Sequence, residues 1–290
     1  MSDLVTKFAP YTDEIFKAES KTSLLTNTDF DWSGANTVKV YKISTASLSD
    51  YGRHYDSGDS GVTLPISRYG DLLDLSATTE TFQLQKDRSF IFNIDKADRD
   101  ETAEQLAAAS ALARELREVV VPEVDSWVYA KMAAGAGTKA DAASLTKSNI
   151  YGKILDGSET LDDNEVPEVG RVLVVCPSVY NVLKQAISET AYSDVAEDLR
   201  AKGVVAMLDG MAVVRVPSAR LPENFGFMIA HPSATVAPVK LEDYNIHQDT
   251  PLSSGDVVTG RIIYGAYVLA NKNKGIYYQA LPAASGGSGN

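Results

Sequence analysis

The sequence has little of the chemistry that enzymes use: one cysteine, Cys176, and three histidines, His54, His231 and His247, among 290 residues. A single thiol excludes a disulfide framework within the chain and a multi-thiolate zinc or iron–sulfur site. No G-x-S-x-G turn and no glycine-rich phosphate loop accompanies the few histidines. We therefore predict no catalytic, cofactor-binding or metal-ligating residue, no cofactor, and a protein that is not an enzyme.

Positive charge and long hydrophobic runs are also scarce. The chain has 27 Lys and Arg against 39 Asp and Glu, a net charge of −12 spread along its length. Such a surface does not bind nucleic acid by neutralising phosphates. The longest apolar-rich run, residues 262–270, has nine residues, whereas a helix needs about 20 to span a bilayer. We predict no membrane partner and synthesis in a cytoplasm.

The remaining candidate sites have simpler structural explanations. Six carboxylates between Asp156 and Glu168 lack the alternating ligands and mid-loop glycine of a calcium loop, so we expect an exposed face or loop. Cys176 ends an apolar run, and a buried, inert thiol is the expectation there. Asp98 and Glu101 have the spacing of a helix capping box rather than of an acid–base pair.

The first third of the chain is predicted to be extended. Residues 1–35 contain many large apolar side chains without helical spacing, which is consistent with an arm on another surface or a segment folded onto its own core. Residues 36–48 have the pattern of a strand, and residues 79–94 have the pattern of a returning pair of strands. The 49–78 stretch between them is rich in Gly, Asp and Ser. The pattern predicts a projecting hairpin, which needs a partner surface because a lone hairpin is marginal in water.

The rest of the chain mixes helices and strands. A long helix is expected over 98–134, with a kink or restart at Pro122. The other predicted helices are 146–164, 177–187 and 193–202. The predicted strands are 170–176, 204–208, 211–216, 225–230, and the strand-like stretches 234–248 and 259–280, with Asp209-Gly210 as a hairpin turn. The fold class is α+β, and the 284–290 tail is flexible by composition.

The order of these parts resembles the major capsid proteins of tailed phages, of the Hong Kong 97 type, from Phe8 to about Leu281. Five runs carry the resemblance: Phe90–Asp98, Val121–Asp125, Val166–Pro177, Ala230–Ala234 and Gly260–Leu269. It implies a major capsid (head) protein that assembles into hexamers and pentamers of an icosahedral shell around double-stranded DNA.

The resemblance also implies a division of the chain and a set of partners. The expected parts are an N-arm (1–35), an extended E-loop (36–94), a P-domain with a spine helix (95–144), an A-domain (145–233), a returning P-domain sheet (234–283) and a C-terminal tail (284–290). Expected partners are further copies of the chain, a scaffolding protein, a portal protein, a possible decoration protein, and packaged DNA without sequence-specific contacts. The expected location is the virion capsid, after assembly in the bacterial host cytoplasm.

Two departures from some relatives change what is expected. Those relatives join an E-loop lysine to an asparagine of a neighbour, but this chain has no lysine between Lys42 and Lys86. We predict no such cross-link. Other relatives begin with a long scaffolding segment, whereas this sequence reaches the arm soon after Met1. We therefore expect a separate scaffolding protein and little processing.

Three alternatives stay open from the sequence. An encapsulin-type compartment shell shares the fold, and a long loop tip rich in Gly and Asp favours the virus. A soluble α/β enzyme lacks support because no histidine-based site is evident. A tail tube or decoration protein is disfavoured by the long helix joined to an α+β body.

Overall fold

The computed structural model describes residues 20–27, 37–43, 45–51, 69, 74, 77–96, 108–186, 204–248 and 254–283. The chain divides into two compact units, the segment Thr37–Gln83 and the remainder. Several expectations lie outside the described residues: most of the N-terminal arm, His54, the capping box at Asp98, the helix over 193–202 and the 284–290 tail.

The smaller unit is an antiparallel hairpin. Strand β1 (Thr37–Ile43) pairs with β2 (Ala77–Gln83), in a register that runs from Thr37 opposite Gln83 to Ile43 opposite Ala77. Both strands are rich in residues that favour a pleated surface, such as Val, Ile, Thr and Tyr. The predicted hairpin is confirmed.

The next strand belongs to a different sheet. Strand β3 (Lys86–Asp95) pairs with β11 (Gly255–Tyr264), which in turn pairs with β10 (Val239–Gln248). Two strands over 79–94 were predicted correctly, but they do not pair with each other. Gly260 in the middle strand leaves room for the rings of Phe90 and Tyr244, whose centroids are 6.1 Å apart.

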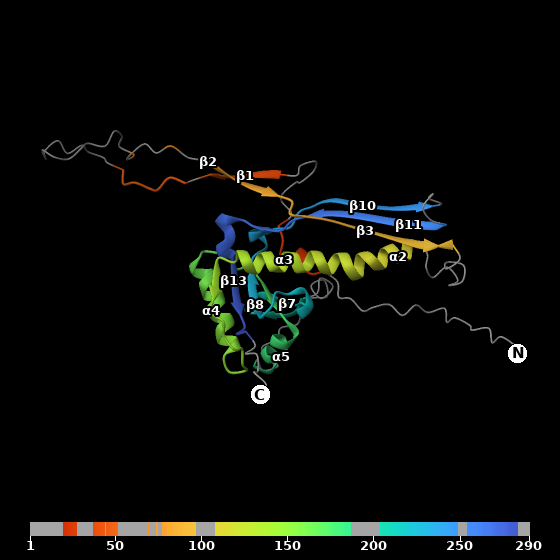
Figure 1. Ribbon diagram of the computed structural model, residues 1–290. Helices are drawn as coiled ribbons and strands as arrows, with labels where there is room; N and C mark the ends of the chain where they lie inside the picture. The colour runs from red at the N-terminus through yellow and green to blue at the C-terminus, as the bar shows by residue number, and fades with distance from the viewer. Residues whose placement is uncertain are drawn as a thin grey trace, which may run out of the picture. The chain divides into compact units, whose positions relative to one another are not determined.

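A long helix runs beside this three-stranded sheet (Figure 1). It comprises α2 (Ala108–Glu115), a π-helical segment η2 (Leu116–Val120) and α3 (Val121–Gly135). Pro122 lies in the first turn of α3, directly after the π-helical turn. The predicted restart at Pro122 therefore takes the form of a wider turn within one continuous helical run, because that turn accommodates a residue that lacks an N–H and crowds the preceding turn.

The main sheet has six strands in the order β4-β13-β8-β5-β7-β6. The bounds are β4 (Thr138–Ala140), β5 (Val172–Val175), β6 (Val204–Leu208), β7 (Met211–Arg215), β8 (Phe225–Ala230) and β13 (Ile276–Ala280). Asp209 and Gly210 both have positive φ, 49° and 72°, as a tight two-residue hairpin turn requires. The predicted turn between β6 and β7 is confirmed.

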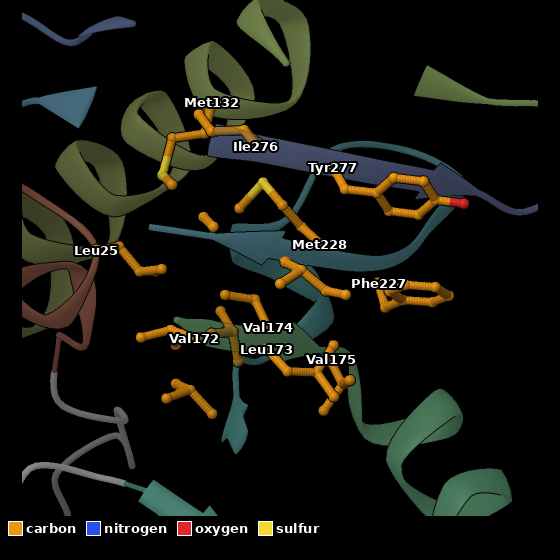
Figure 2. Close-up of a cluster of buried hydrophobic side chains, with 14 of the residues drawn as sticks. Leu25, Met132, Val172, Leu173, Val174, Val175, Phe227, Met228, Ile276 and Tyr277 are labelled. Carbon is orange, nitrogen blue, oxygen red and sulfur yellow. The ribbon is translucent and has the colours of Figure 1, made fainter. Parts of the chain in front are cut away.

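Helices pack on both faces of the main sheet. Helices α4 (Ile150–Asp163) and α5 (Pro177–Ala186) contact each other, α4 also contacts β13, and α3 contacts β13 as well. Gly157 allows α4 to approach closely, since a Cβ there would lie 2.9 Å from Ile229 Cδ1. Figure 2 shows Leu25 and Met132 directed toward β5, β8 and β13, where all residues of β5 and β8 are buried.

Short elements complete the larger unit: η1 (Thr22–Leu24), η4 (Ser218–Arg220), η5 (Pro232–Ala234), β9 (Thr235–Val236), β12 (Tyr267–Val268) and η6 (Ala270–Gly275). The strand-like stretch predicted over 259–280 contains the end of β11, β12 and β13, with η6 between β12 and β13. The fold is α+β, as the sequence predicted.

Candidate functional site

A buried ion pair connects three parts of the larger unit. Arg220 Nη1, in η4, lies 2.7 Å from Asp125 Oδ2, in α3, and the two side chains are 5 % and 3 % exposed. Ser20 donates its hydroxyl to Asp125 Oδ1 at 2.6 Å. Burial is the main cause that raises the pKa of nearby Tyr129, with the Asp125 charge acting in the same direction. Charge and hydrogen bonding thus anchor the N-terminal segment to the long helix.

The same segment is folded onto its own core. Leu25 is fully buried, and the Asn27 N–H donates to the Thr235 carbonyl at 2.7 Å. For residues 20–27, this favours the second of the two alternatives that the sequence left open.

A second polar cluster joins the long helix to the three-stranded sheet. Glu123 Oε1 accepts from Arg88 Nε at 2.7 Å and from the Tyr264 hydroxyl at 3.1 Å. Burial, with the Glu123 hydrogen bond and charge acting in the same direction, raises the pKa of Tyr264 to about 12. Tyr264 therefore keeps its proton at neutral pH, and its donated hydrogen bond holds β11 against α3.

The two described histidines and the cysteine each contact neighbouring polar groups. His231 Nδ1 accepts from the Ser233 N–H, and His231 Nε2 lies 3.2 Å from the Val169 carbonyl, so Nε2 carries the proton. Burial is the main cause that lowers the pKa of His231, with Arg171 and Lys272 adding to it. His247 is exposed beside the Thr259 hydroxyl, and Cys176 is buried 3.1 Å from the Ser178 hydroxyl.

The acidic run is spread over the outside of α4 and the loop that follows. All six carboxylates are exposed: Asp156, Glu159, Asp162, Asp163, Glu165 and Glu168. Asp162 pairs at 2.7 Å with the buried Arg171, and Asp156 pairs with Lys153. Within the described ranges, no group of three His, Cys, Asp or Glu side chains is arranged to hold a metal ion.

Large apolar side chains remain on several surfaces. In the hairpin unit they are Leu48, Tyr51 and Tyr69; in the larger unit they are Ile91, Val119, Tyr151, Leu155, Val169, Val239 and Ile246. Tyr151 and Leu155 are four residues apart and share the outer face of α4. In the part of the chain that is described, no helix has the length and hydropathy needed to cross a membrane. Tyr51 and Tyr69 contact each other edge to face, with ring centroids 5.1 Å apart.

The sequence reasoning missed the Asp125–Arg220 pair. A signal was present, because Asp125 falls on the same stripe as Val128, Tyr129 and Met132, at the spacing of one buried helix face. A carboxylate on a buried stripe indicates a buried partner. The identity of that partner, 95 residues along the chain, was not readable from spacing.

Comparison with known proteins bears on the fold and the family. The family model described as "Phage capsid protein" matches residues 77–279. No curated protein matches the sequence. Among solved structures, one from Mycobacterium phage Che8 has a TM-score of 0.70 at 21 % identity, covering 94 % of this chain and 96 % of that chain. The capsid of cyanophage P-SCSP1u has a TM-score of 0.70 at 15 % identity, covering 96 % and 93 %.

The fold also extends beyond phages. A virus-like particle from Pyrococcus furiosus has a TM-score of 0.55 at 12 % identity, over 90 % of this chain and 92 % of that chain. The fold alone therefore does not distinguish a phage capsid from another kind of protein shell. The family match does distinguish them, and the encapsulin-type alternative is not favoured. The chain belongs to the phage capsid protein family, as a major capsid protein of a tailed phage with the Hong Kong 97 fold.

Proposed function

We propose that the protein forms the hexamers and pentamers of an icosahedral shell that encloses double-stranded DNA, without enzymatic activity. The observation that carries this proposal is the combination of a capsid-family chain with apolar side chains left exposed on both of its units. Those surfaces are satisfied when copies of the chain pack around closed symmetry axes. Assembly in the bacterial host cytoplasm is part of the proposal.

We assign the parts of the chain by the same logic. The β1–β2 hairpin is the core of the E-loop (36–94), which also includes nearly all of β3, and α2–α3 with β10 and β11 belong to the P-domain (95–144 and 234–283). Strands β5 to β8 of the main sheet, with α4 and α5, form most of the A-domain (145–233), whereas β4 and β13 of the same sheet fall within the P-domain ranges. This division is supported by the hairpin forming a compact unit of its own.

The further partners follow from the role as a shell. A separate scaffolding protein would guide closure, a portal protein would occupy one vertex, and a decoration protein could bind the outside. The net charge of −12 supports DNA packaging without specific contacts, since an acidic wall repels DNA and keeps it mobile.

Electron microscopy of the purified protein tests the proposed function. Co-expression with the neighbouring head genes should yield closed shells tens of nanometres wide. A protein that stays monomeric under all assembly conditions would contradict the proposal.

The outer face of α4 is expected to take part in subunit contacts. Leu155 is 38 % exposed there, beside Tyr151 and the acidic side chains. We expect Leu155→Asp to abolish shells while the far-ultraviolet circular dichroism of the subunit is unchanged, because a charge replaces an apolar contact between copies. Particle yield is measured by sedimentation and microscopy.

Val169→Asp is the matched control. Val169 is apolar and 88 % exposed but lies outside α4, in the loop before β5. We expect this variant to assemble normally. A normal particle yield from Leu155→Asp would remove α4 from the subunit interface, and a loss of shells from Val169→Asp as well would show that the effect is not specific to α4.

Mature particles are expected to be free of the lysine–asparagine cross-link. The reason is chemical, since no lysine occurs between Lys42 and Lys86 to act as the nucleophile. Denaturing electrophoresis should give one subunit band of 31.2 kDa or less, whereas a covalent ladder would contradict this expectation.

A further inference from the structure

A basic and aromatic cluster lies where helix α5 meets the end of strand β7. Arg215, the last residue of β7, places its guanidinium carbon over the Tyr180 ring of α5, 5.4 Å from the ring centroid. Lys184 follows Tyr180 by four residues and therefore lies on the same side of α5. Lys21 joins them from the N-terminal segment, because its Nζ donates to the Arg215 carbonyl at 3.1 Å. These four residues are called the α5 cluster below.

The α5 cluster is positive on a chain whose net charge is −12. Arg215 and Lys184 are both exposed, and within the described ranges neither is paired with a carboxylate. Cations gathered without an acid repel each other, and a carboxylate supplied by another molecule would relieve that repulsion. The cluster therefore favours a partner with an acidic surface.

The outer face of α4 has this charge. Four exposed residues at intervals of four form one stripe along it, called the α4 stripe: Tyr151, Leu155, Glu159 and Asp163. Glu159 and Asp163 have no basic partner among the residues that the structure describes. By contrast, Asp156 and Asp162 of the same helix are paired within the subunit. The stripe thus presents an apolar half and a half with unpaired negative charge.

We propose that the α5 cluster of one copy binds the α4 stripe of a second copy, with Glu159 and Asp163 beside the basic side chains and the apolar half against Tyr180. Helices α4 and α5 of one subunit contact each other, yet in the part of the chain that is described no ion pair joins the stripe to the cluster. Pairing of the two surfaces therefore requires a second copy.

The contact is heterologous, because the two surfaces differ, and such a contact can repeat around a closed ring. Side chains at intervals of four form the ridges by which helices pack, so the stripe is suited to lie against α5. This inference rests on the proposed function and names the surfaces through which copies join.

Charge reversal tests the proposal in assembling particles. We expect Lys184→Glu and Glu159→Lys each to lower particle yield by about tenfold or more, because like charges then meet at every repeat of the contact. Combined in one chain, the two changes should recover at least about half of the wild-type yield, since the reversed charges attract again. The control pair Lys274→Glu/Glu159→Lys makes the same net change with an exposed lysine of η6, outside the cluster, and is expected to stay defective.

Disulfide trapping is a second measurement that does not depend on charge. Glu159→Cys/Lys184→Cys places one thiol on each surface, while the native Cys176 is buried. Under mild oxidation of particles we expect disulfide-linked chains of two or more subunits on non-reducing electrophoresis. A disulfide confined to single chains, or none, would contradict the proposed contact.

The outcomes separate this inference from the proposed function. Wild-type shells together with normal yields from both single variants would overturn the inference alone, as would a double variant as defective as the control pair. Absence of shells from the wild-type chain would contradict the proposed function, and the inference with it. Urea midpoints of the free subunits should match the wild type, since every changed side chain is exposed.

Discussion

Replacing Asp125 by alanine is expected to lower the free energy of unfolding of the subunit by about 3–5 kcal/mol, the cost of breaking a buried ion pair by removing one partner. Arg220 loses a carboxylate at 2.7 Å while its guanidinium stays buried, and Ser20 loses its acceptor. The N-terminal segment and η4 then lose the charged connection to α3 that the Asp125 carboxylate supplies. Urea unfolding followed by circular dichroism measures the change.

An exposed pair of similar geometry serves as the control. Asp87 and Arg261 form two hydrogen bonds, at 2.6 Å and 3.0 Å, across β3 and β11, but both side chains are half exposed. Exposed pairs contribute little because water and salt screen them. We expect Asp87→Ala to leave the unfolding midpoint nearly unchanged. Similar losses from the two variants would show that burial does not set the strength of the Asp125 pair.

Replacing Gly226 by valine is expected to lower the free energy of unfolding by about 3 kcal/mol, the upper end of the usual cost of overpacking. Gly226 lies in β8, at an irregular register with β13, and a Cβ there would be 2.6 Å from the Gln279 carbonyl oxygen. That contact is with backbone, so no side-chain rotation relieves it and β8 and β13 must separate. Soluble yield and the urea midpoint both report this change.

Gly152→Ala is the contrasting glycine variant. Gly152 is exposed in α4, and a Cβ there would have no neighbour within 4 Å. Alanine in an exposed helix is favoured over glycine by about 0.5–1 kcal/mol, so we expect a small gain in stability. A loss from Gly152→Ala as large as that from Gly226→Val would place the cause outside the packing of β8 against β13.

Local sequence signals predicted the elements whose causes are local. The apolar run before Pro177 became the buried β5, Phe225–Ala230 became β8, and Asp209-Gly210 became a tight turn. In each case the pattern of side chains and the turn chemistry act within a few residues. The hairpin of β1 with β2 was also readable, although more than thirty residues separate the two strands.

The pairing of strands that are far apart in the sequence could not be predicted from local patterns. β2 and β3 are separated by two residues, yet β3 pairs with β11 from the far end of the chain. Its alternating Phe90, Phe92 and Ile94 show that one face is buried but do not name the partner strand. The pairing of Asp125 with Arg220 has the same character, because spacing indicates that a partner is needed and only the fold supplies it.

Only part of the candidate site could be predicted from the sequence. The sequence indicated an apolar arm and a hairpin that need partner surfaces, and exposed apolar side chains are present in the hairpin unit. It gave no sign of the apolar face on α4, since Tyr151 and Leu155 lie within a run dominated by carboxylates. Spacing alone cannot tell such an exposed pair from part of a core stripe. The structure makes the distinction, because it shows that the opposite face of the helix is buried.

The burial of Cys176 makes the subunit a convenient object for labelling. The chain has no other thiol, so a cysteine introduced at an exposed position such as Val169 would be the one site open to a maleimide reagent. Each subunit would then carry a single dye or peptide at a known residue. A closed assembly of such subunits would display the label at a fixed copy number and regular spacing, without any change to its core.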